Sequence, residues 1–220
     1  MTTLLALALM TAAYQDKPQD IPKGELPKTA TCVVCTSNGG EEGEEKPAAG
    51  VRYLGKSYYF CNAKEVGEFK KDPEAFMPPI LPRPAPKLSA TKVEGGAVSL
   101  EDYKGKVVLI DFWATWCAPC IKSMPAIEKL YASRKDKGFV ALGVSIDEDT
   151  KKVAPFLKKQ KFTYPILLDD AASPTWANYK VRAIPAIFLI DREGQVVAQW
   201  KGEPKLADIE AAVDAALAKG

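Results

Sequence analysis

The chain has 220 residues, of which 47% are hydrophobic, so it is long enough for one large domain or for two unequal ones. Its 30 Lys and Arg residues nearly balance its 28 Asp and Glu residues, and the resulting net charge of +2 argues against a nucleic-acid partner. The sequence contains no histidine, so any base, metal ligand or pH switch must be built from other side chains.

Residues 4–13 are apolar and end in small side chains. This pattern is typical of a secretory signal peptide, although a basic region ahead of it is missing, and it is too short to span a bilayer. We therefore predict a signal peptide at residues 1–14 and a periplasmic or secreted protein that does not require a membrane. A short N-terminal helix is the alternative. Residues 15–30 are polar, contain prolines and are predicted to be a linker.

A short unit with three cysteines comes next. Cys32 and Cys35 form a Cys-x-x-Cys pair, and Cys61 closes a run rich in tyrosine. Together with residues 69–76, this pattern resembles a YHS-type metal-binding module. The resemblance implies a small α+β module over residues 31–77.

The same resemblance implies a metal site. Cys32, Cys35 and Cys61 would supply the ligands, and soft thiolates select copper(I) or zinc. Glu65 stands four residues after Cys61, where that family usually has a further cysteine. The ligand set would then be three thiolates with at most one carboxylate, which zinc accepts. Two alternatives stay open: a module without metal, and oxidation of Cys32 and Cys35 in an oxidising compartment.

Residues 78–86 include five prolines in nine positions. Such a stretch is stiff and extended and is typical of a spacer between domains. We predict that it links the cysteine-bearing module to a second, larger domain at residues 87–220.

The larger unit alternates strand and helix patterns, which indicates an α/β fold. Residues 107–113 form a continuous apolar run, as in a strand that is buried on both faces. Ser173 followed by proline predicts a helix start, and Asp191 to Gly194 predict a hairpin turn. The other strands are predicted at 139–146, 186–190 and 195–200, and the helices at 121–135, 150–160 and 206–217.

A second Cys-x-x-Cys pair, Cys117 and Cys120, lies between the strand at 107–113 and the following helix. Free backbone N–H groups and the helix dipole stabilise a thiolate at such a position. Cys120 lies one helical turn on and can close a disulfide ring. We predict thiol–disulfide exchange with Cys117 attacking and Cys120 resolving. A structural disulfide or half of a zinc site are the alternatives, but no second Cys-x-x-Cys or histidine pair in this unit supports zinc.

Four segments of this unit, at residues 104–117, 143–147, 181–185 and 188–191, carry a second resemblance. Through them, residues 85–220 resemble a thioredoxin-fold domain of the TlpA/ResA-like group of extracytoplasmic thiol–disulfide oxidoreductases. The fold implied for this thioredoxin-like domain is a central mixed sheet flanked by helices. The activity implied requires no cofactor, acts on protein thiols and disulfides, and depends on an upstream electron-donor protein.

The resemblance also assigns roles around the cysteines. It implies that Pro185 follows a cis peptide bond and, with Ile184, offers backbone groups to a substrate strand. Trp116 would form a wall of the substrate site. One departure concerns Ser123, which stands three residues after Cys120, where that group often carries a glutamate. The acid function would therefore fall on another residue.

Asp111 is the candidate for that acid, because it lies in the middle of an apolar strand, six residues before Cys117. An ionised carboxylate buried there costs several kcal/mol, so its pKa should rise and the group can accept a proton. The match to the buried acid of thioredoxins implies the same role.

We therefore expect an extracytoplasmic enzyme that exchanges disulfides with protein substrates through its Cys-Ala-Pro-Cys motif. The alternative is a copper- or zinc-handling protein whose thioredoxin domain maintains thiols for metal loading. The metal content of the purified chain after anaerobic reduction distinguishes the two.

Overall fold

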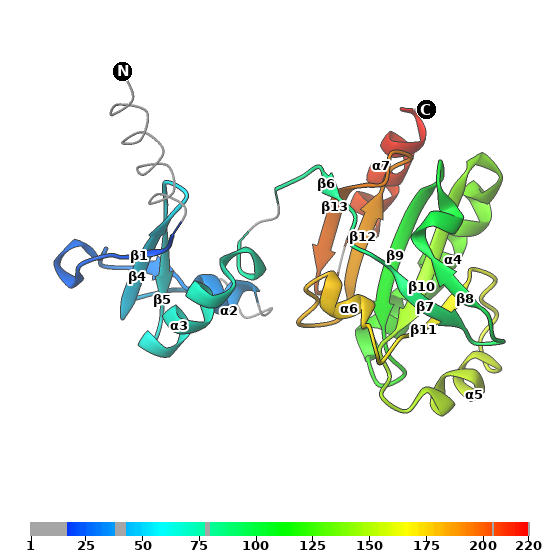
Figure 1. The fold of residues 1–220 in the computed structure, drawn as a ribbon, viewed down its shortest axis with the longest axis horizontal. Helices are drawn as coiled ribbons and strands as arrows, with labels where there is room; N and C mark the ends of the chain where they lie inside the picture. The colour runs from blue at the N-terminus through cyan, green and yellow to red at the C-terminus, as the bar shows by residue number, and fades with distance from the viewer. Residues whose placement is uncertain (1–16, 38–42, 78–79, 204, 220) are drawn as a thin grey trace, which may run out of the picture. The chain divides into compact units, whose positions relative to one another are not determined.

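A computed structural model describes residues 17–37, 43–77, 80–203 and 205–219 (Figure 1). The chain divides into two compact units, Met1–Pro79 and Ile80–Gly220. The predicted signal peptide at residues 1–14 lies outside the described residues. Within the described ranges, no helix combines the length and the apolar character needed to cross a bilayer.

In the described residues of the N-terminal unit, two small sheets are combined with the α-helices α2 and α3. Phe69 is fully buried at its centre and contacts the rings of Tyr58, Phe60 and Phe76 at centroid distances of 5.0 to 6.1 Å. The larger sheet has the strand order β1-β4-β5, and the smaller one pairs β2 with β3. The elements are β1 (Gln19–Asp20), β2 (Ala30–Thr31), α2 (Val33–Ser37), β3 (Glu44–Glu45), β4 (Ala49–Tyr53), β5 (Lys56–Phe60) and α3 (Ala63–Lys71).

The structure corrects the prediction of a linker over residues 15–30. Strand β1 pairs with β4, and the side chain of Ile21 is only 6% exposed. The backbone N–H of Ile21 donates to the carbonyl of Gly50 at 2.8 Å. A β-carbon at Gly50 would lie 2.9 Å from Leu26 and 3.1 Å from Ile21, so the absence of a side chain lets this segment dock. The composition of this segment did not reveal that Ile21 and Leu26 pack against Gly50.

The C-terminal unit is built on one mixed sheet with the strand order β6-β13-β12-β9-β10-β11-β7-β8. Strands β9, β10 and β11 run parallel, and β12 lies antiparallel to β9. The strands are β6 (Arg83–Pro84), β7 (Ser89–Lys92), β8 (Ala97–Ser99), β9 (Val107–Trp113), β10 (Phe139–Ser145), β11 (Ile166–Asp169), β12 (Ala186–Ile190) and β13 (Gln195–Lys201), and the helices are α4 (Ala118–Arg134), α5 (Val153–Leu157), α6 (Thr175–Asn178) and α7 (Leu206–Leu217).

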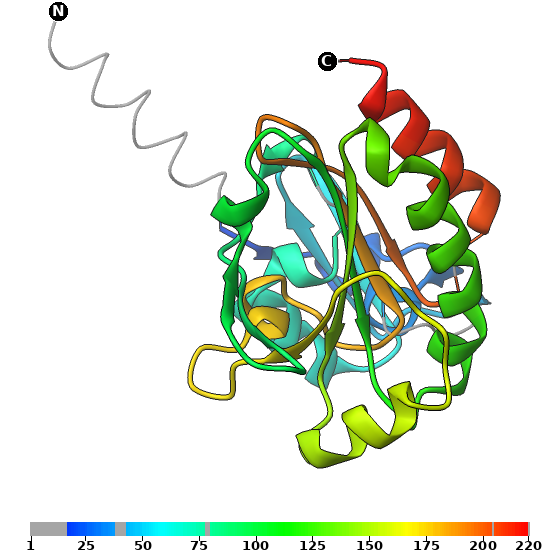
Figure 2. The same ribbon diagram turned by 90° about the vertical axis from the view of Figure 1, so that its right-hand side faces the viewer.

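Helices cover both faces of this sheet, as Figure 2 shows for α4 and α7 lying together on one of them. Alternate residues of β9 point to opposite faces. Leu109 and Trp113 join the core cluster that contains residues of α4, α5 and α7, and we call this side the α4 face. Ile110 and Phe112 join the cluster on the other side, with Tyr179 just after α6, and we call that side the α6 face.

Three local predictions differ from the structure. The predicted linker at 78–86 is shorter than expected, because Arg83 and Pro84 form strand β6, which pairs with β13. The predicted helix at 150–160 is shorter, since a 3-10 turn precedes α5 and tight turns follow it. Ser173 does not cap α6, because the Asp169 carboxylate accepts the N–H groups of Thr175 and Trp176 at 2.8 and 3.0 Å.

Candidate active site and candidate metal centre

Cys117 begins helix α4 at the end of a short turn that follows β9. It is the N-cap residue, and its sulfur accepts the backbone N–H of Cys120 at 3.3 Å. Its own N–H donates to the carbonyl of Ala114 at 3.1 Å, which closes the turn. The sulfur of Cys117 therefore lies at the positive end of a helix dipole, where a thiolate is stabilised.

Cys117 and Cys120 form a disulfide with their Cα atoms 5.3 Å apart. Cys120 is fully buried, whereas Cys117 retains 4% of its surface. Ser123, which replaces the glutamate expected from the resemblance, is buried and donates from its hydroxyl to the carbonyl of Cys120 at 2.8 Å. A substrate can therefore reach the disulfide only from the side of Cys117.

The turn before Cys117 is held by Asp147, a residue to which the sequence analysis gave no role. Its carboxylate accepts the N–H of Thr115 at 2.9 Å, the hydroxyl of Thr115 at 2.6 Å and the hydroxyl of Ser145 at 2.8 Å. Ser145 is the last residue of β10, which runs parallel to β9, and Asp147 lies two residues further on. Since the carboxyl ends of parallel strands meet at one sheet edge, this signal was present in the sequence.

Asp111 lies on β9, on the α4 face between Leu109 and Trp113. Its side chain is 1% exposed, and neither carboxyl oxygen has a hydrogen-bond partner among the described residues. Burial raises the pKa of Asp111 to about 7. The carboxyl group can therefore change protonation state near neutral pH, as general acid–base chemistry requires.

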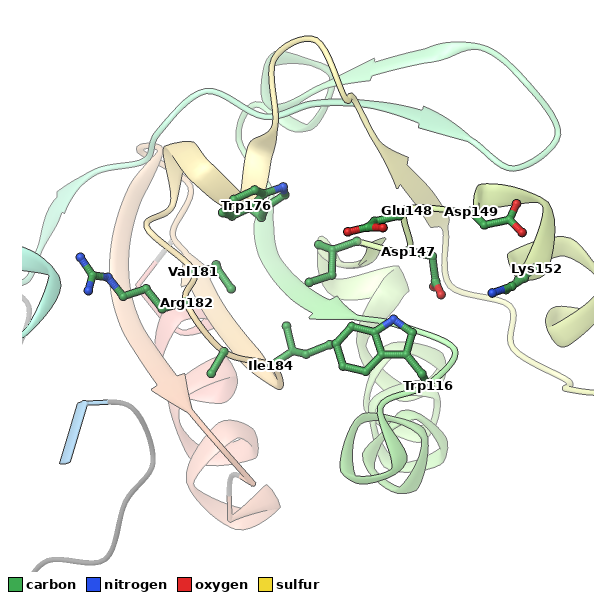
Figure 3. A pocket seen from close by; sticks show the side chains of 11 residues that line it. Trp116, Asp147, Glu148, Asp149, Lys152, Trp176, Val181, Arg182 and Ile184 are labelled. Carbon is green, nitrogen blue, oxygen red and sulfur yellow. The ribbon is translucent and has the colours of Figure 1, made fainter. Parts of the chain in front are cut away.

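The loop before β12 brings Ile184 to the same cavity as Trp116 (Figure 3). This cavity has a volume of about 610 Å³, and Trp116, which directly precedes Cys117, is 68% exposed at its edge. The bond between Ile184 and Pro185 is cis, as the resemblance implied. Pro185 itself is buried and does not line the cavity, and its carbonyl accepts the N–H of Gly202 at 2.9 Å.

Residues after β10 and α6 complete the cavity. Trp176 reaches it from α6 and is 42% exposed, so two indoles are offered to a ligand. Glu148, Asp149 and Lys152 contribute charges of both signs on one side. Figure 3 shows Trp116 and Trp176 on different sides of the opening. The lining is therefore aromatic with a mixed rim, which suits an extended peptide.

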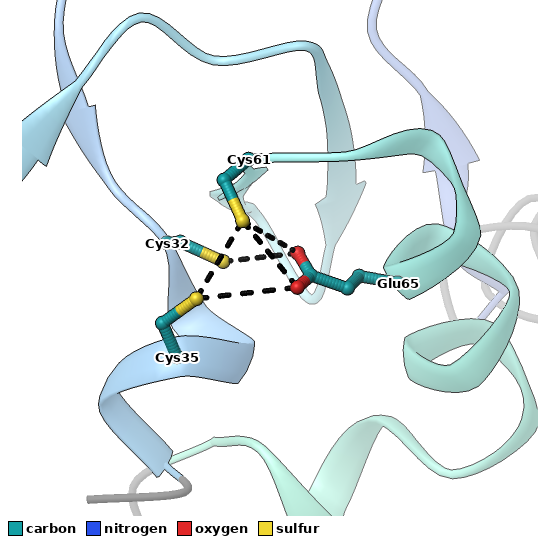
Figure 4. A group of neighbouring side chains, drawn as sticks. All are labelled: Cys32, Cys35, Cys61 and Glu65. Atoms are coloured by element: carbon teal, nitrogen blue, oxygen red, sulfur yellow. Dashed lines mark hydrogen bonds between the residues drawn. The ribbon is translucent and has the colours of Figure 1, made fainter. Parts of the chain in front are cut away.

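In the N-terminal unit, Cys32, Cys35, Cys61 and Glu65 converge on one point (Figure 4). Their ligand atoms all lie within 4.8 Å of one another. The sulfurs of Cys35 and Cys61 are 3.5 Å apart, and a carboxylate oxygen of Glu65 lies 3.1 Å from the sulfur of Cys32 and 3.3 Å from that of Cys61. All three cysteines are free thiols. The cluster therefore joins the three predicted ligands to Glu65.

Local structure explains how these four residues meet. Cys32 and Cys35 flank the start of α2, and Cys61 directly follows β5. The side chain of Asn62 caps α3 by accepting the N–H of Glu65 at 3.1 Å, which turns Glu65 toward the three sulfurs. Tetrahedral zinc with Zn–S bonds of about 2.3 Å separates its sulfur ligands by about 3.8 Å, close to the spacing of this cluster. The donor set thus fits a zinc-like cation.

Hydrogen bonds within the cluster raise the pKa values of Cys35 and Cys61 and so favour their protonated forms. The hydrogen bond with Cys35, followed by burial, raises the pKa of Cys61 to about 12. The hydrogen bond with Cys32 is the largest cause that raises the pKa of Cys35. A bound cation would have to displace these protons, so metal affinity at this cluster would increase with pH.

Comparison with known proteins identifies relatives of the C-terminal unit. The family model described as Redoxin matches residues 82–216, which include the disulfide and the cavity. The chain is 36% identical over 126 residues to the thiol-disulfide oxidoreductase ResA of Bacillus thuringiensis subsp. konkukian (strain 97-27), covering 57% of this chain and 72% of that relative. It is 40% identical over 114 residues to the thioredoxin-like protein YneN of Bacillus subtilis (strain 168), covering 51% and 66%.

A solved structure shares the architecture. The crystal structure of a thiol:disulfide interchange protein of the thioredoxin family from Chlorobium tepidum TLS superposes with a TM-score of 0.56 at 29% sequence identity. The superposition covers 64% of this chain and 99% of that one. These matches confirm the predicted thioredoxin-like α/β fold with a mixed sheet flanked by helices.

Proposed function

Because the chain belongs to the Redoxin family, we propose that it is an extracytoplasmic enzyme that exchanges disulfides with protein substrates through Cys117 and Cys120. The enzyme class, thiol–disulfide oxidoreductase, is confirmed by relatives of that name. The single observation that carries the proposed site is the disulfide at the N-terminus of α4, with Cys117 as the helix cap. The apolar segment at residues 4–13 supports export from the cytoplasm.

The proposed reaction proceeds in two exchange steps when the protein acts as a reductant. The Cys117 thiolate attacks a substrate disulfide, which forms a mixed disulfide and releases one substrate thiolate. Cys120 then gives its proton to the ionised Asp111 carboxylate and attacks the sulfur of Cys117. This second step forms the Cys117–Cys120 disulfide, releases the other substrate thiolate and completes the transfer of two electrons. An upstream donor protein would restore the dithiol, and no cofactor takes part.

We assign substrate binding to Trp116, Ile184 and Pro185. Trp116 and Ile184 line one cavity beside Cys117, so a chain that places its disulfide at Cys117 passes along that cavity. Backbone groups next to Pro185 would pair with such a chain as an added strand.

The trapping of mixed disulfides tests this proposal. Cys32, Cys35 and Cys61 are first replaced by serine, so that only the active-site thiols remain. In that background, Cys120→Ser should accumulate mixed disulfides with client proteins, because no resolving thiol is left to release them. Cys117→Ser should accumulate none. Non-reducing electrophoresis measures the mixed disulfides of both variants. Equal trapping by the two variants would contradict the assignment of Cys117 as the attacking thiol and Cys120 as the resolving thiol.

A second candidate function is suggested by the cluster of Cys32, Cys35, Cys61 and Glu65. We propose that the N-terminal unit is a YHS-type module that binds copper(I) or zinc, and that the thioredoxin domain maintains thiols for metal loading. The convergence of four ligand atoms within 4.8 Å supports this proposal. The carboxylate of Glu65 favours zinc, because copper(I) prefers soft ligands only.

Metal content tests the second candidate. Full-length protein carrying Cys117→Ser and Cys120→Ser is reduced without oxygen, loaded with zinc or copper(I) and desalted. We expect about one metal ion per chain, and a loss of affinity of tenfold or more for Glu65→Gln, since each ligand contributes to the site. Glu68→Gln, an exposed glutamate on the same helix, is the matched control. If Cys61→Ser with Cys32→Ser retained the full metal content, the ion would not be bound at this cluster.

A further inference from the structure

Asp111 faces a neighbouring strand position that has no side chain. Its register partner on β10 is Gly143, and parallel partners point to the same face of a sheet. Neighbouring strands lie about 4.8 Å apart, so whatever occupies the space above Gly143 lies beside the Asp111 carboxyl group. On the other side, Asp111 pairs with Ile187 of β12, which is apolar.

Ile166, Tyr164 and Trp113 fill the space above Gly143. A β-carbon at Gly143 would lie 2.7 Å from Cδ1 of Ile166 and 3.0 Å from Cε2 of Tyr164, the ring carbon next to the one that carries the hydroxyl. It would lie 3.3 Å from Nε1 of Trp113. The absence of a side chain at position 143 therefore leaves room for these three side chains above the strand that pairs with Asp111.

These polar groups share an unusual property. The Tyr164 hydroxyl, Nε1 of Trp113 and both carboxyl oxygens of Asp111 are buried, and none has a hydrogen-bond partner among the described residues. Buried polar atoms without partners cost free energy, so two donors and an acceptor gathered on the same face require an explanation.

The backbone of Tyr164 is fixed on both sides. Glu128 of α4 accepts the N–H of Tyr164 at 3.2 Å and the N–H of Thr163 at 2.7 Å. The carbonyl of Pro165 accepts the N–H of Gly143 at 3.0 Å. The ring of Tyr164 also lines a second cavity of about 320 Å³, together with Thr163 and Pro165. The backbone of Tyr164 is therefore held by α4, the helix that follows Cys117 and contains Cys120.

We propose that Tyr164 is a positioning residue for Asp111, whose ionised carboxylate receives a hydrogen bond from the Tyr164 hydroxyl and so remains available to accept the Cys120 proton. The inference rests on the proposed role of Asp111 and extends it to a second residue. The Tyr164 hydroxyl keeps its own proton throughout. The proton that is transferred passes from the Cys120 thiol to the Asp111 carboxylate. Nε1 of Trp113 is a further donor on the same side.

The ionisable groups on this face agree with a donor role for Tyr164. Burial first, then the negative charges of Asp111 and Glu128, raise the pKa of Tyr164 well above its usual value, so its hydroxyl keeps its proton. Cys117 and Cys120 are joined as a disulfide, and the ring of Tyr131 lies 6.4 Å from that of Tyr164. Among the described residues, no cation contributes to the raised pKa of Asp111, for which burial is the cause.

The variant Tyr164→Phe tests this assignment, because it removes one oxygen and leaves the ring. Carboxyl ¹³C NMR of the oxidised full-length protein follows the titration of Asp111 directly. We expect its midpoint to rise by about one pH unit in Tyr164→Phe, because a hydrogen bond to the charged form is lost. The pH profile of the exchange rate should shift upward by the same amount.

Tyr179→Phe is the matched control. Among the described residues the hydroxyl of Tyr179 is also buried without a partner, but it lies on the α6 face, so its removal should leave the midpoint of Asp111 unchanged. Gly143→Ala adds a carbon that would crowd both Ile166 at 2.7 Å and Tyr164 at 3.0 Å, and we expect it to shift the midpoint in the same direction as Tyr164→Phe. An unchanged midpoint in folded Tyr164→Phe overturns the proposal.

The two readouts separate this inference from the proposed function. If Asp111→Asn kept the wild-type pH profile of exchange, the role of Asp111 as proton acceptor would fail. The NMR midpoint would still report whether Tyr164 contacts the Asp111 carboxylate.

Discussion

At the residue scale, Asp111 links the stability of the protein to pH. Its pKa is raised from 3.8 to about 7, so the folded state holds a proton that the unfolded state has released between these values. The contribution of Asp111 to the free energy of unfolding is therefore fully present below pH 4 and is lost as the pH rises through 7. The loss amounts to about 4 kcal/mol at most, from the size of the pKa shift.

Asp111→Asn should remove this dependence. We expect the oxidised variant to be more stable than the wild type at pH 8, with the advantage fading toward pH 4, and to exchange disulfides more slowly. Thermal melts at a series of pH values measure the effect. Asp136→Asn, at an exposed aspartate, is the control. A variant less stable than the wild type at pH 8 would mean that Asp111 is ionised and paired in the folded protein.

Single residues also show how far the sequence could predict the site. Cys117 and Cys120 were identifiable because a Cys-x-x-Cys pair next to an apolar strand constrains both position and chemistry. Tyr164 was not, because its role depends on Gly143, a residue without a side chain on another strand. Such a contact depends on sheet register, which no local pattern in this chain reveals.

At the element scale, the junction of β9 and α4 depends on a carboxylate from β10. Asp147 accepts three hydrogen bonds there, two of them from Thr115. An amide in its place cannot accept all three, because one oxygen becomes a donor. The geometry of the turn that presents Cys117 is therefore set by a neighbouring strand.

Asp147→Asn should loosen this turn. We expect a loss of about 1–3 kcal/mol in the free energy of unfolding, since buried donors lose their acceptor, and slower disulfide exchange. Denaturant unfolding of the oxidised protein measures the first effect. Asp149→Asn is the control, because among the described residues its carboxylate accepts a hydrogen bond only from the N–H of Lys151. Equal stability of the two variants would show that the turn does not depend on Asp147.

The elements themselves were predicted unevenly. The continuous apolar run of β9 and the hairpin of β12 and β13 were predicted correctly, because burial on both faces and a Gly-containing turn leave clear signals. The start of α6 was assigned to the wrong cap, since Asp169 and Ser173 are both good cap residues and only the folded chain shows which one reaches the N–H groups. The helix predicted at 150–160 was too long, because a 3-10 turn at Thr150–Lys152 takes the place of its start and tight turns take the place of its end.

At the scale of the whole molecule, the two units have separate cores and separate chemistry. The fold of the C-terminal unit follows from alternating strand and helix patterns, and the Redoxin match covers it. The N-terminal unit has only short strands, whose partners are set by a few contacts such as that between Ile21 and Gly50. Its boundary was therefore misplaced by the sequence analysis. The structure brings its three cysteines together with Glu65, and their role as metal ligands stays a prediction.

The exposed indole of Trp116 gives the protein an optical property. Trp116 directly precedes Cys117 and is 68% exposed, next to a bond that can accept an electron from an excited indole. The disulfide should quench the emission of Trp116, and reduction to the dithiol should restore it. The molecule thus carries its own fluorescent reporter, with which the oxidation state of Cys117 and Cys120 can be followed in real time without an added label.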